Sequence, residues 1–315
     1  MSAGHRSGLW RRTFAVMNAR ELKALISLLD DSDREVFGNV RDKLVSLGPD
    51  VIPELESVWE GTFNTELQQR IEEIIHHIQL GEITLQFHEW IDQGAKDLLR
   101  GIILVARYQY PDLEEDKIHQ FVGRLKKDIW MEINHSQTAL EQCKVFNHVF
   151  YGIHQFAANT TNYQAPENNY INKLIESKKG NAVTLAALYI VVAQSLELPV
   201  HGVNLPEHFI LCWLDKSEIT RLLLGKTQTP VLFYMNPLNR GAVFSRREID
   251  AFLMQSKIEP KDHYYTPTAN YTIIIRMFNN LISYYSREGR PEKAGELTAL
   301  KENIIARIEG MENGG

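Results

Sequence analysis

One apolar segment of the chain constrains the fold most, because it fits only between other layers of structure. Residues 184–196 are apolar on nearly every side and span about three helical turns. A stripe at helical spacing fills one side, and small residues keep the other side thin: Leu185, Leu188, Val192 and Leu196, then Ala186, Ala187 and Ala193. Pro199 follows, and proline cannot continue a helix. We therefore predict a central helix that lies under another element.

Two short strands are predicted directly after this helix. Residues 200–203 form the first strand, residues 204–207 a turn and residues 208–213 the second strand. The period of two along a strand places His208, Ile210 and Cys212 on one face. The predicted fold class is therefore α+β: mostly helical, with a small antiparallel sheet packed on the central helix.

A helix followed by strands, with a histidine at the head of the second strand, resembles the core of papain-like and transglutaminase-like enzymes. In such cores a cysteine at the helix N-terminus gains thiolate character from the helix dipole and a histidine. The transglutaminase pattern G-x-C-x-x-x-A corresponds here to residues 180–186, GNAVTLA. Ala182 stands at the cysteine position, so the nucleophile is missing.

Three segments resemble one branch of that superfamily more closely, the bacterial SirB-type transglutaminase-like proteins. These segments are KKGNAVTLA (178–186), ELPVHGV (197–203) and LPEHFIL (205–211). An upstream N-x-Y-L-like segment is matched by Asn168, Tyr170 and Ile171, and a downstream D-P-F-N-x-G segment by residues 236–241. The similarity covers residues 95–245 and continues more loosely to the C-terminus. It implies a degenerate papain-like or transglutaminase core.

The chain departs from the family pattern at the positions that carry chemistry. Asn181 and Ala182 replace an Ile-Pro pair, Glu207 replaces a glycine, and Asn236 replaces an aspartate. The resemblance thus assigns the three triad positions to Ala182, His208 and Asn236. Acyl transfer by this route needs a thiolate, an imidazole and a carboxylate. The chain supplies a methyl group, an imidazole and an amide.

No other side chain near these positions replaces the nucleophile. A helix turns the hydroxyl of Thr184 about 200° away from position 182. Cys212 lies about 13 Å along the strand from His208. The amide oxygen of Asn236 can still accept a hydrogen bond from the His208 ring. We therefore predict a cleft without catalytic residues that binds, with Thr184, Asn168, Asn181 and Glu207 as the cleft-binding candidates.

Two structural alternatives stay open for these residues. His208 can be a buried polar residue that ties two strands together. Asn168 can be a turn asparagine that bonds backbone groups in the polar segment 158–170.

Composition gives no general attraction to polyanions. The chain has 315 residues and a formal net charge of −6, which predicts neither nucleic-acid nor membrane binding. Cys143 and Cys212 lack metal-type spacing and are predicted to be free thiols in a cytoplasmic protein. His76, His77 and His88 are expected to be solvated or capping residues. We expect no metal and no cofactor.

Four regions are predicted along the chain. Residues 1–18 form a disordered leader, with translation starting at Met1 or at Met17. Residues 19–94 resemble a HEAT-like helical region. Residues 95–260 form the SirB-type transglutaminase-like domain, and residues 261–315 a helical pair that resembles one tetratricopeptide unit.

The functional prediction follows from the missing nucleophile. The leading hypothesis is a non-catalytic, pseudoenzyme-like regulatory scaffold that binds an unknown protein or peptide. The alternative is a hydrolase or acyl transferase that acts on small amide or ester substrates through His208. A third hypothesis is a regulatory protein whose cleft holds no ligand. The sequence leaves the partner, the pathway and the oligomeric state open.

Overall fold

The computed structural model describes residues 19–31, 33–134, 136–215 and 231–313, so the predicted leader lies outside the described residues. The chain divides into two units, Met1–Leu85 and Gln86–Gly315. The division falls within the long helix α4 (Thr65–Asp92). Every described helix falls short of the length and apolar character that crossing a membrane requires.

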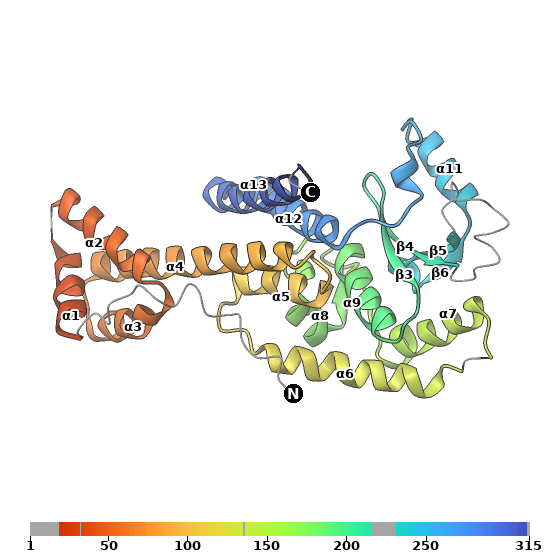
Figure 1. The fold of residues 1–315 in the computed structure, drawn as a ribbon, viewed down its shortest axis with the longest axis horizontal. Coiled ribbons are helices and arrows are strands. Elements are labelled where there is room, and N and C mark those ends of the chain that lie inside the picture. Colours follow the sequence, from red (N-terminus) through yellow and green to blue (C-terminus); the bar gives the residue numbers. More distant parts are fainter. Residues whose placement is uncertain (1–18, 32, 135, 216–230, 314–315) are drawn as a thin grey trace. The chain divides into compact units, whose positions relative to one another are not determined.

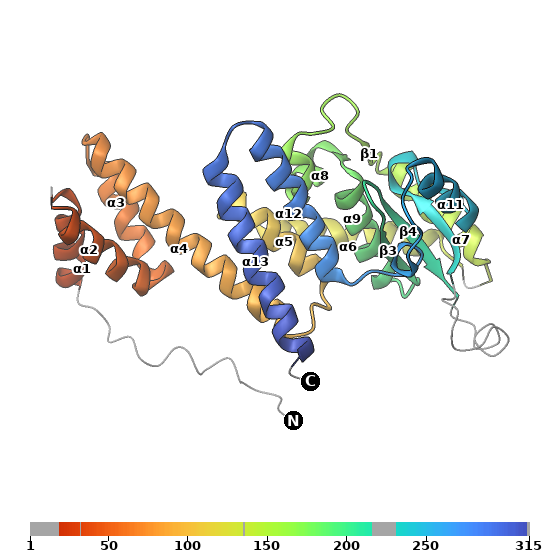
Figure 2. The ribbon, with the colours of Figure 1, turned by 90° about the horizontal axis from the view of Figure 1, so that it is seen from above.

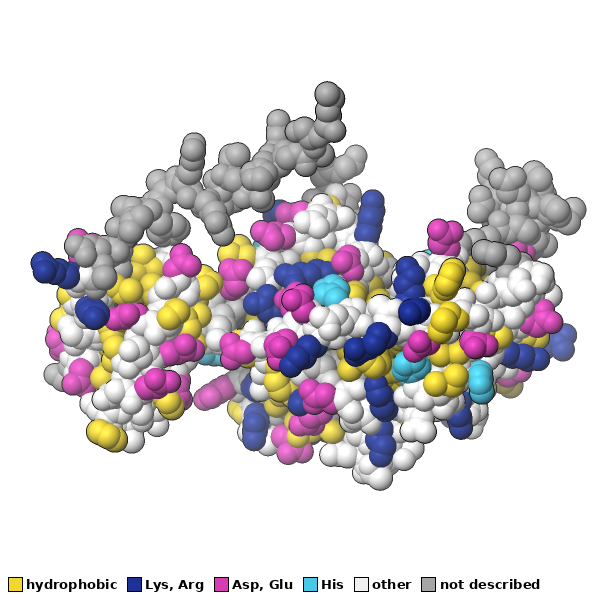
Figure 3. Space-filling view, turned by 90° about the horizontal axis from the view of Figure 1, so that it is seen from below, with side chains coloured by type: hydrophobic (Ala, Val, Ile, Leu, Met, Phe, Trp, Pro, Cys, Tyr) yellow, Lys and Arg dark blue, Asp and Glu magenta, His cyan; other side chains and the backbone are white. Residues whose placement is uncertain are grey.

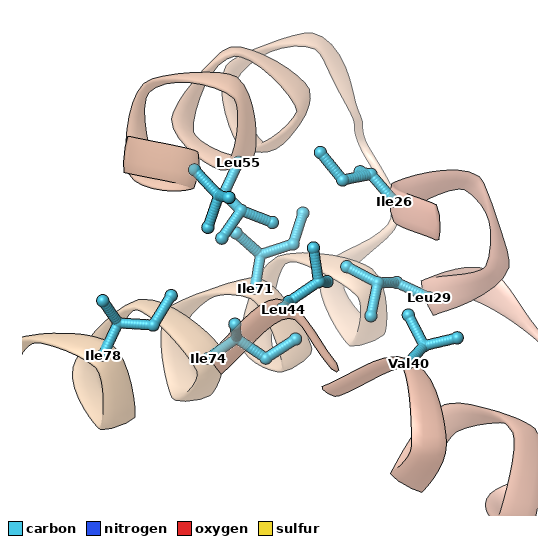
Figure 4. Packing of buried hydrophobic residues seen from close by; sticks show 9 residues of the cluster. Ile26, Leu29, Val40, Leu44, Leu55, Ile71, Ile74 and Ile78 are labelled. Atoms are coloured by element: carbon cyan, nitrogen blue, oxygen red, sulfur yellow. The ribbon is translucent and has the colours of Figure 1, made fainter. Parts of the chain in front are cut away.

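The described part of the first unit is built from helices. Its elements are α1 (Ala19–Ser27), η1 (Leu28–Asp30), α2 (Arg34–Leu47), η2 (Pro49–Val51), α3 (Ile52–Gly61) and the first part of α4. The Asp33 side chain caps α2 by accepting a hydrogen bond from the Glu35 N–H at 2.8 Å. Figure 4 shows how the apolar stripes of these helices meet in one core, which includes Ile26, Leu29, Leu44, Leu55, Ile71 and Ile74. The HEAT-like assignment of this unit stays a prediction.

The second unit contains helices around a small four-stranded sheet (Figure 1), together with a short two-stranded parallel sheet. Its first half holds α5 (Leu98–Gln109), α6 (Glu115–Glu132), α7 (Ala139–Asn147), the π-helix η3 (His148–Ile153), β1 (Ala157–Ala158), η4 (Pro166–Asn169), α8 (Ile171–Ser177) and β2 (Lys179–Gly180). Its second half holds α9 (Ala182–Ser195), β3 (Val200–Asn204), β4 (Phe209–Leu214), β5 (Val231–Asn236), η5 (Pro237–Asn239), β6 (Ala242–Phe244), α11 (Arg246–Gln255), η6 (Asp262–Tyr264), α12 (Asn270–Arg287) and α13 (Pro291–Asn313).

The central helix α9 has no solvent-facing side over most of its length. Residues 182–190 are all buried, because α5, α6, α8 and α12 contact the helix together with β3 and β4. It begins at Ala182, two residues before the predicted start at position 184. The earlier start results from the Asn181 side chain, which caps the helix and fixes its first turn.

The four-stranded sheet is antiparallel and has the order β3-β4-β5-β6. Val203 pairs with Ile210, and Leu211 pairs with Met235. The mostly helical α+β fold class, with a small antiparallel sheet, is confirmed. β4 begins at Phe209, so His208 belongs to the preceding turn and not to the strand as predicted.

Alternation along the strands gives the sheet two different faces. On one face, the Met235 sulfur lies 3.2 Å from the Cys143 sulfur and 4.0 Å from the Tyr189 hydroxyl of α9. The other face packs against α11 through a cluster that contains Val203, Ile210, Cys212, Tyr234, Ile249 and Leu253. The sheet therefore lies between α9 and α11 (Figure 1). The predicted common face of Ile210 and Cys212 is confirmed.

The last two helices form an antiparallel pair against the central domain (Figure 2). Phe278 of α12 packs edge-on against Phe87 with 5.6 Å between ring centroids. The Tyr108 hydroxyl of α5 donates to the Glu296 carboxylate of α13 at 2.5 Å. This pair covers part of the domain, whereas its likeness to a tetratricopeptide unit stays a prediction.

Gly202 should be sensitive to the smallest enlargement. A Cβ added there would lie 2.5 Å from the Phe209 ring, whose side chain is buried. We expect Gly202→Ala to lower the free energy of unfolding by about 1–3 kcal/mol, because overpacking a buried site forces its neighbours to move. Gly123→Ala is the control, since nothing lies within 4 Å of that exposed helical position. It should stabilise by about 0.5–1 kcal/mol. Urea unfolding measures both, and equal effects would contradict the packing argument.

Candidate functional site

The first turn of α9 is where the family pattern places a nucleophile. Ala182 occupies its first position and is 8% exposed. The Asn181 side-chain oxygen accepts hydrogen bonds from the Thr184 N–H at 3.0 Å and from the Thr184 hydroxyl at 3.2 Å. A methyl group therefore stands where a thiolate would benefit from the helix dipole.

A buried chain of asparagines holds this turn in place. The Asn169 side-chain oxygen accepts from the Asn181 amide at 2.7 Å and from the Asn280 amide at 3.2 Å. These bonds join η4, the start of α9 and α12 across positions far apart in the sequence. We call Asn169, Asn181 and Asn280 the asparagine network. Because each bond satisfies a group that is shielded from water, the network specifies how the three elements dock.

Asn168 and Thr184 are likewise committed to the fold. The Asn168 amide donates to the backbone oxygens of Asn162 and Tyr163 at 2.8 and 3.0 Å, and its oxygen accepts from Asn159 at 2.9 Å. The structure thus places Asn168 in the turn role that the sequence left open. Thr184 is fully buried and bonded to Asn181. Three of the cleft-binding candidates, Asn168, Asn181 and Thr184, already bond within the chain.

His208 lies on the α11 side of the sheet. Its ring is exposed and packs edge-on against Phe252 with 4.7 Å between centroids. The alternative that His208 is a buried tie between strands is therefore wrong. Its backbone oxygen does close the turn by accepting from the Leu205 N–H at 3.0 Å.

Asn236 ends β5 and serves the turn that follows it. Its side-chain oxygen accepts from the Leu238 N–H at 3.0 Å, which caps η5. The predicted hydrogen bond from the His208 ring does not form within the described residues. By strand alternation from Tyr234, Asn236 belongs to the face that packs on α11, and His208 contacts Phe252 of α11, whereas Ala182 begins the helix on the opposite face. The three triad positions are therefore not joined into one hydrogen-bonded constellation.

Glu207, the fourth binding candidate, is exposed and has φ +60°. A left-handed backbone favours glycine, which is the residue of the family pattern at this position. The glutamate retains the turn at a conformational cost and adds a carboxylate beside His208. This carboxylate acts on Arg276, a residue that the sequence analysis missed.

Arg276 is a partly buried cation on α12, one helical turn before Asn280. Its guanidinium donates only long hydrogen bonds, 3.4 Å each, to the Asn204 side chain and the Leu205 backbone oxygen. Burial lowers its pKa, and the Glu207 carboxylate opposes that shift. Within the described part of the chain it forms no ion pair. A spacing pattern could not reveal this, since the turn that Arg276 touches lies far away in the sequence.

Neither thiol is available as a nucleophile. Cys143 and Cys212 are both fully buried. Burial raises the pKa of Cys143 to about 11 and that of Cys212 to about 12. The described residues also bring together no group of three histidine, cysteine or acidic side chains that could hold a metal ion.

Comparison with known proteins gives a family but no related fold. A family model described as the transglutaminase-like superfamily matches residues 116–279, which is more than half of the chain. A UPF0162 protein of Xylella fastidiosa (strain 9a5c) is 26% identical over 219 residues, covering 65% of this chain and 70% of that protein. A UPF0162 protein of Vibrio cholerae is 25% identical over 219 residues, with 68% and 76% covered. F-box only protein 21 of Mus musculus is 26% identical over 159 residues, with 50% and 24% covered. No solved structure matches.

The asparagine network should be strongly coupled. Asn169→Ala removes the acceptor of the buried Asn181 amide and of the partly buried Asn280 amide, and a buried amide left without a partner costs about 1–3 kcal/mol. We expect Asn169→Ala and Asn181→Ala to be less than additive in chemical unfolding, by about 1 kcal/mol, because both break the same bond. Asn279→Ala, which removes an exposed contact to Lys301, should change stability by less than about 0.5 kcal/mol. Full additivity would show that the network does not couple the two residues.

The two thiols should be inert in the folded protein. At about pH 8 their raised pKa values leave almost no thiolate, and burial excludes the reagent. Iodoacetamide followed by mass spectrometry should find Cys143 and Cys212 unmodified in native protein and both alkylated in guanidinium chloride. Rapid alkylation of either thiol in the native state would contradict this assignment.

Proposed function

The chain belongs to the transglutaminase-like superfamily, and we propose that it is a non-catalytic member that binds a protein or peptide as a regulatory scaffold. The single observation that carries this proposal is Ala182 at the first position of α9. The helix, its cap and its buried surroundings are all present, whereas the group that would attack a carbonyl is not.

The state of the neighbouring groups supports the same proposal. The buried thiols cannot substitute for a cysteine at position 182, and His208 lies on the side of the sheet that packs on α11. The polar residues near Ala182 are occupied in holding the fold. Arg276 differs from them, because a partly buried guanidinium without an ion pair can bind a carboxylate through two parallel hydrogen bonds. We assign carboxylate recognition in the scaffold to Arg276.

Likeness to part of a longer protein also fits a binding module. The matched region spans about a quarter of F-box only protein 21, so a domain of this kind occurs within a larger chain. We propose a cytoplasmic location for this protein.

The alternative function uses the exposed ring of His208 in a hydrolase or acyl transferase. Assays with p-nitrophenyl acetate and a thioester discriminate the two functions. We expect no turnover above the background rate, and none after Ala182→Cys, because His208 packs against Phe252 on the α11 side of the sheet and so cannot activate the new thiol. Turnover that disappears with His208→Ala would favour the enzyme and contradict the scaffold.

The binding function is tested by panning a random-peptide library on the immobilised full chain. We expect enriched peptides with a carboxylate whose affinity falls about tenfold or more with Arg276→Gln, the loss typical of a charge-assisted pair. Arg287→Gln, three turns on along α12 and exposed, should leave affinity unchanged. Absence of any enriched peptide, or equal loss with both variants, would refute the assignment.

A further inference from the structure

Basic side chains gather on the solvent face of α6 and on the loop beside it. Arg124 and Lys127 are exposed on α6, and Lys178 follows the end of α8. Figure 3 views the side on which α6 lies in front and shows lysine and arginine side chains over this helix. We call Arg124, Lys127 and Lys178 the basic face.

Two of these cations meet at one aromatic ring. The Lys178 ammonium lies 4.0 Å from the centroid of the Phe121 ring and 4.8 Å from that of Phe156. The Arg124 guanidinium lies 6.0 Å from the Phe121 centroid. The faces of the rings attract each cation, but they also bring two like charges together. Lys178 adopts φ +61°, a backbone conformation that is costly for a lysine.

Among the residues that the structure describes, no acidic side chain neutralises this pair. Burial lowers the pKa of Lys178, and the charge of Arg124 lowers it further. Asp128, one turn after Arg124 on α6, is bonded instead to His154, with 2.9 Å between Nε2 and Oδ2. No residue of the basic face has an ion pair within the described ranges. Repulsion between like charges disfavours this arrangement, and an anionic ligand would relieve it.

Apolar side chains border the basic face. Met131, one turn after Lys127, is 60% exposed, and Ile153, next to His154, is 58% exposed. A ligand that fits here carries negative charge and apolar groups close together. We propose that the basic face binds an acidic, leucine-rich type of peptide segment on a partner protein, which gives the proposed scaffold function its partner chemistry.

The size of the basic face favours a peptide over other polyanions. Duplex binding through the phosphate backbone typically engages about 6–10 phosphates, and polybasic membrane sites carry about 4–8 cations. The basic face has three residues, and the chain as a whole is acidic with a net charge of −6. Beyond the reach of the three cations, the field of the protein repels a long polyanion.

The test uses fluorescence anisotropy with a labelled peptide of alternating Glu-Glu and Leu-Leu pairs. The double variant Arg124→Gln/Lys178→Gln should weaken binding about tenfold, the sum of two modest ion pairs. The matched control Lys126→Gln/Arg247→Gln also removes one lysine charge and one arginine charge. Lys126 points about 200° around α6 from Arg124, and Arg247 lies on α11, so this control should change affinity less than about twofold. Equal thermal midpoints establish that both variants fold.

Other outcomes overturn the proposal. Equal affinity of the double variant and the wild type would remove the basic face from binding. Wild-type binding to a single-stranded RNA or to phosphatidylserine vesicles, but not to the peptide, would assign the face to another polyanion. If the peptide does not bind while library panning still yields peptides that depend on Arg276, this inference fails and the proposed function stands. Failure of both experiments rejects the function itself.

Discussion

The fold depends on the buried N-terminus of α9, which a side chain of the protein caps. Because residues 182–190 of α9 are buried, the donors of its first turn cannot rely on solvent, and each unsatisfied donor would cost about 1–3 kcal/mol. The Asn181 side-chain oxygen accepts a hydrogen bond from the Thr184 N–H. Its amide donates to Asn169, which also accepts a hydrogen bond from Asn280. The position of α12 and of the loop before α8 therefore follows from the capping of α9.

Much of the architecture is predictable because it depends on the local spacing of apolar residues and on the residues that end helices and strands. The apolar segment that ends before Pro199 predicts a central helix, and alternation after it predicts the shared face of Ile210 and Cys212. The errors have a different origin. The predicted helix start missed the cap at Asn181, although an asparagine three residues before Thr184 is itself a local N-cap signal. What the sequence could not show is that the same side chain also bonds Asn169. The hydrogen bond between His208 and Asn236 does not form among the described residues. A motif assigns positions in the chain, whereas the face of the sheet that a side chain occupies depends on strand register.

The residues that we propose bind a partner are harder to predict than the residues that build the fold. Arg276 and Lys178 look like ordinary charged residues of a helix and a turn, and only tertiary structure shows what surrounds them. Arg276 donates a hydrogen bond to Asn204 at the end of β3, 72 residues earlier in the sequence. Lys178 and Arg124 both lie near the ring of Phe121. Neither of these contacts produces a spacing pattern in the sequence, because no repeat or strand register connects the two segments that form each contact.

A cleft that keeps its fold and lacks its nucleophile has few groups left with which to bind. Hydrogen bonds already used inside the chain cannot also recognise a ligand without breaking the packing that they specify, which excludes the asparagine network, Asn168 and Thr184. Binding free energy must come from groups whose interactions are incomplete. Arg276 has long hydrogen bonds and, among the described residues, no ion pair. Lys178 contacts the Phe121 ring beside the like charge of Arg124. Both are cations, which is why the proposed partner is the same at each place: one that carries carboxylates.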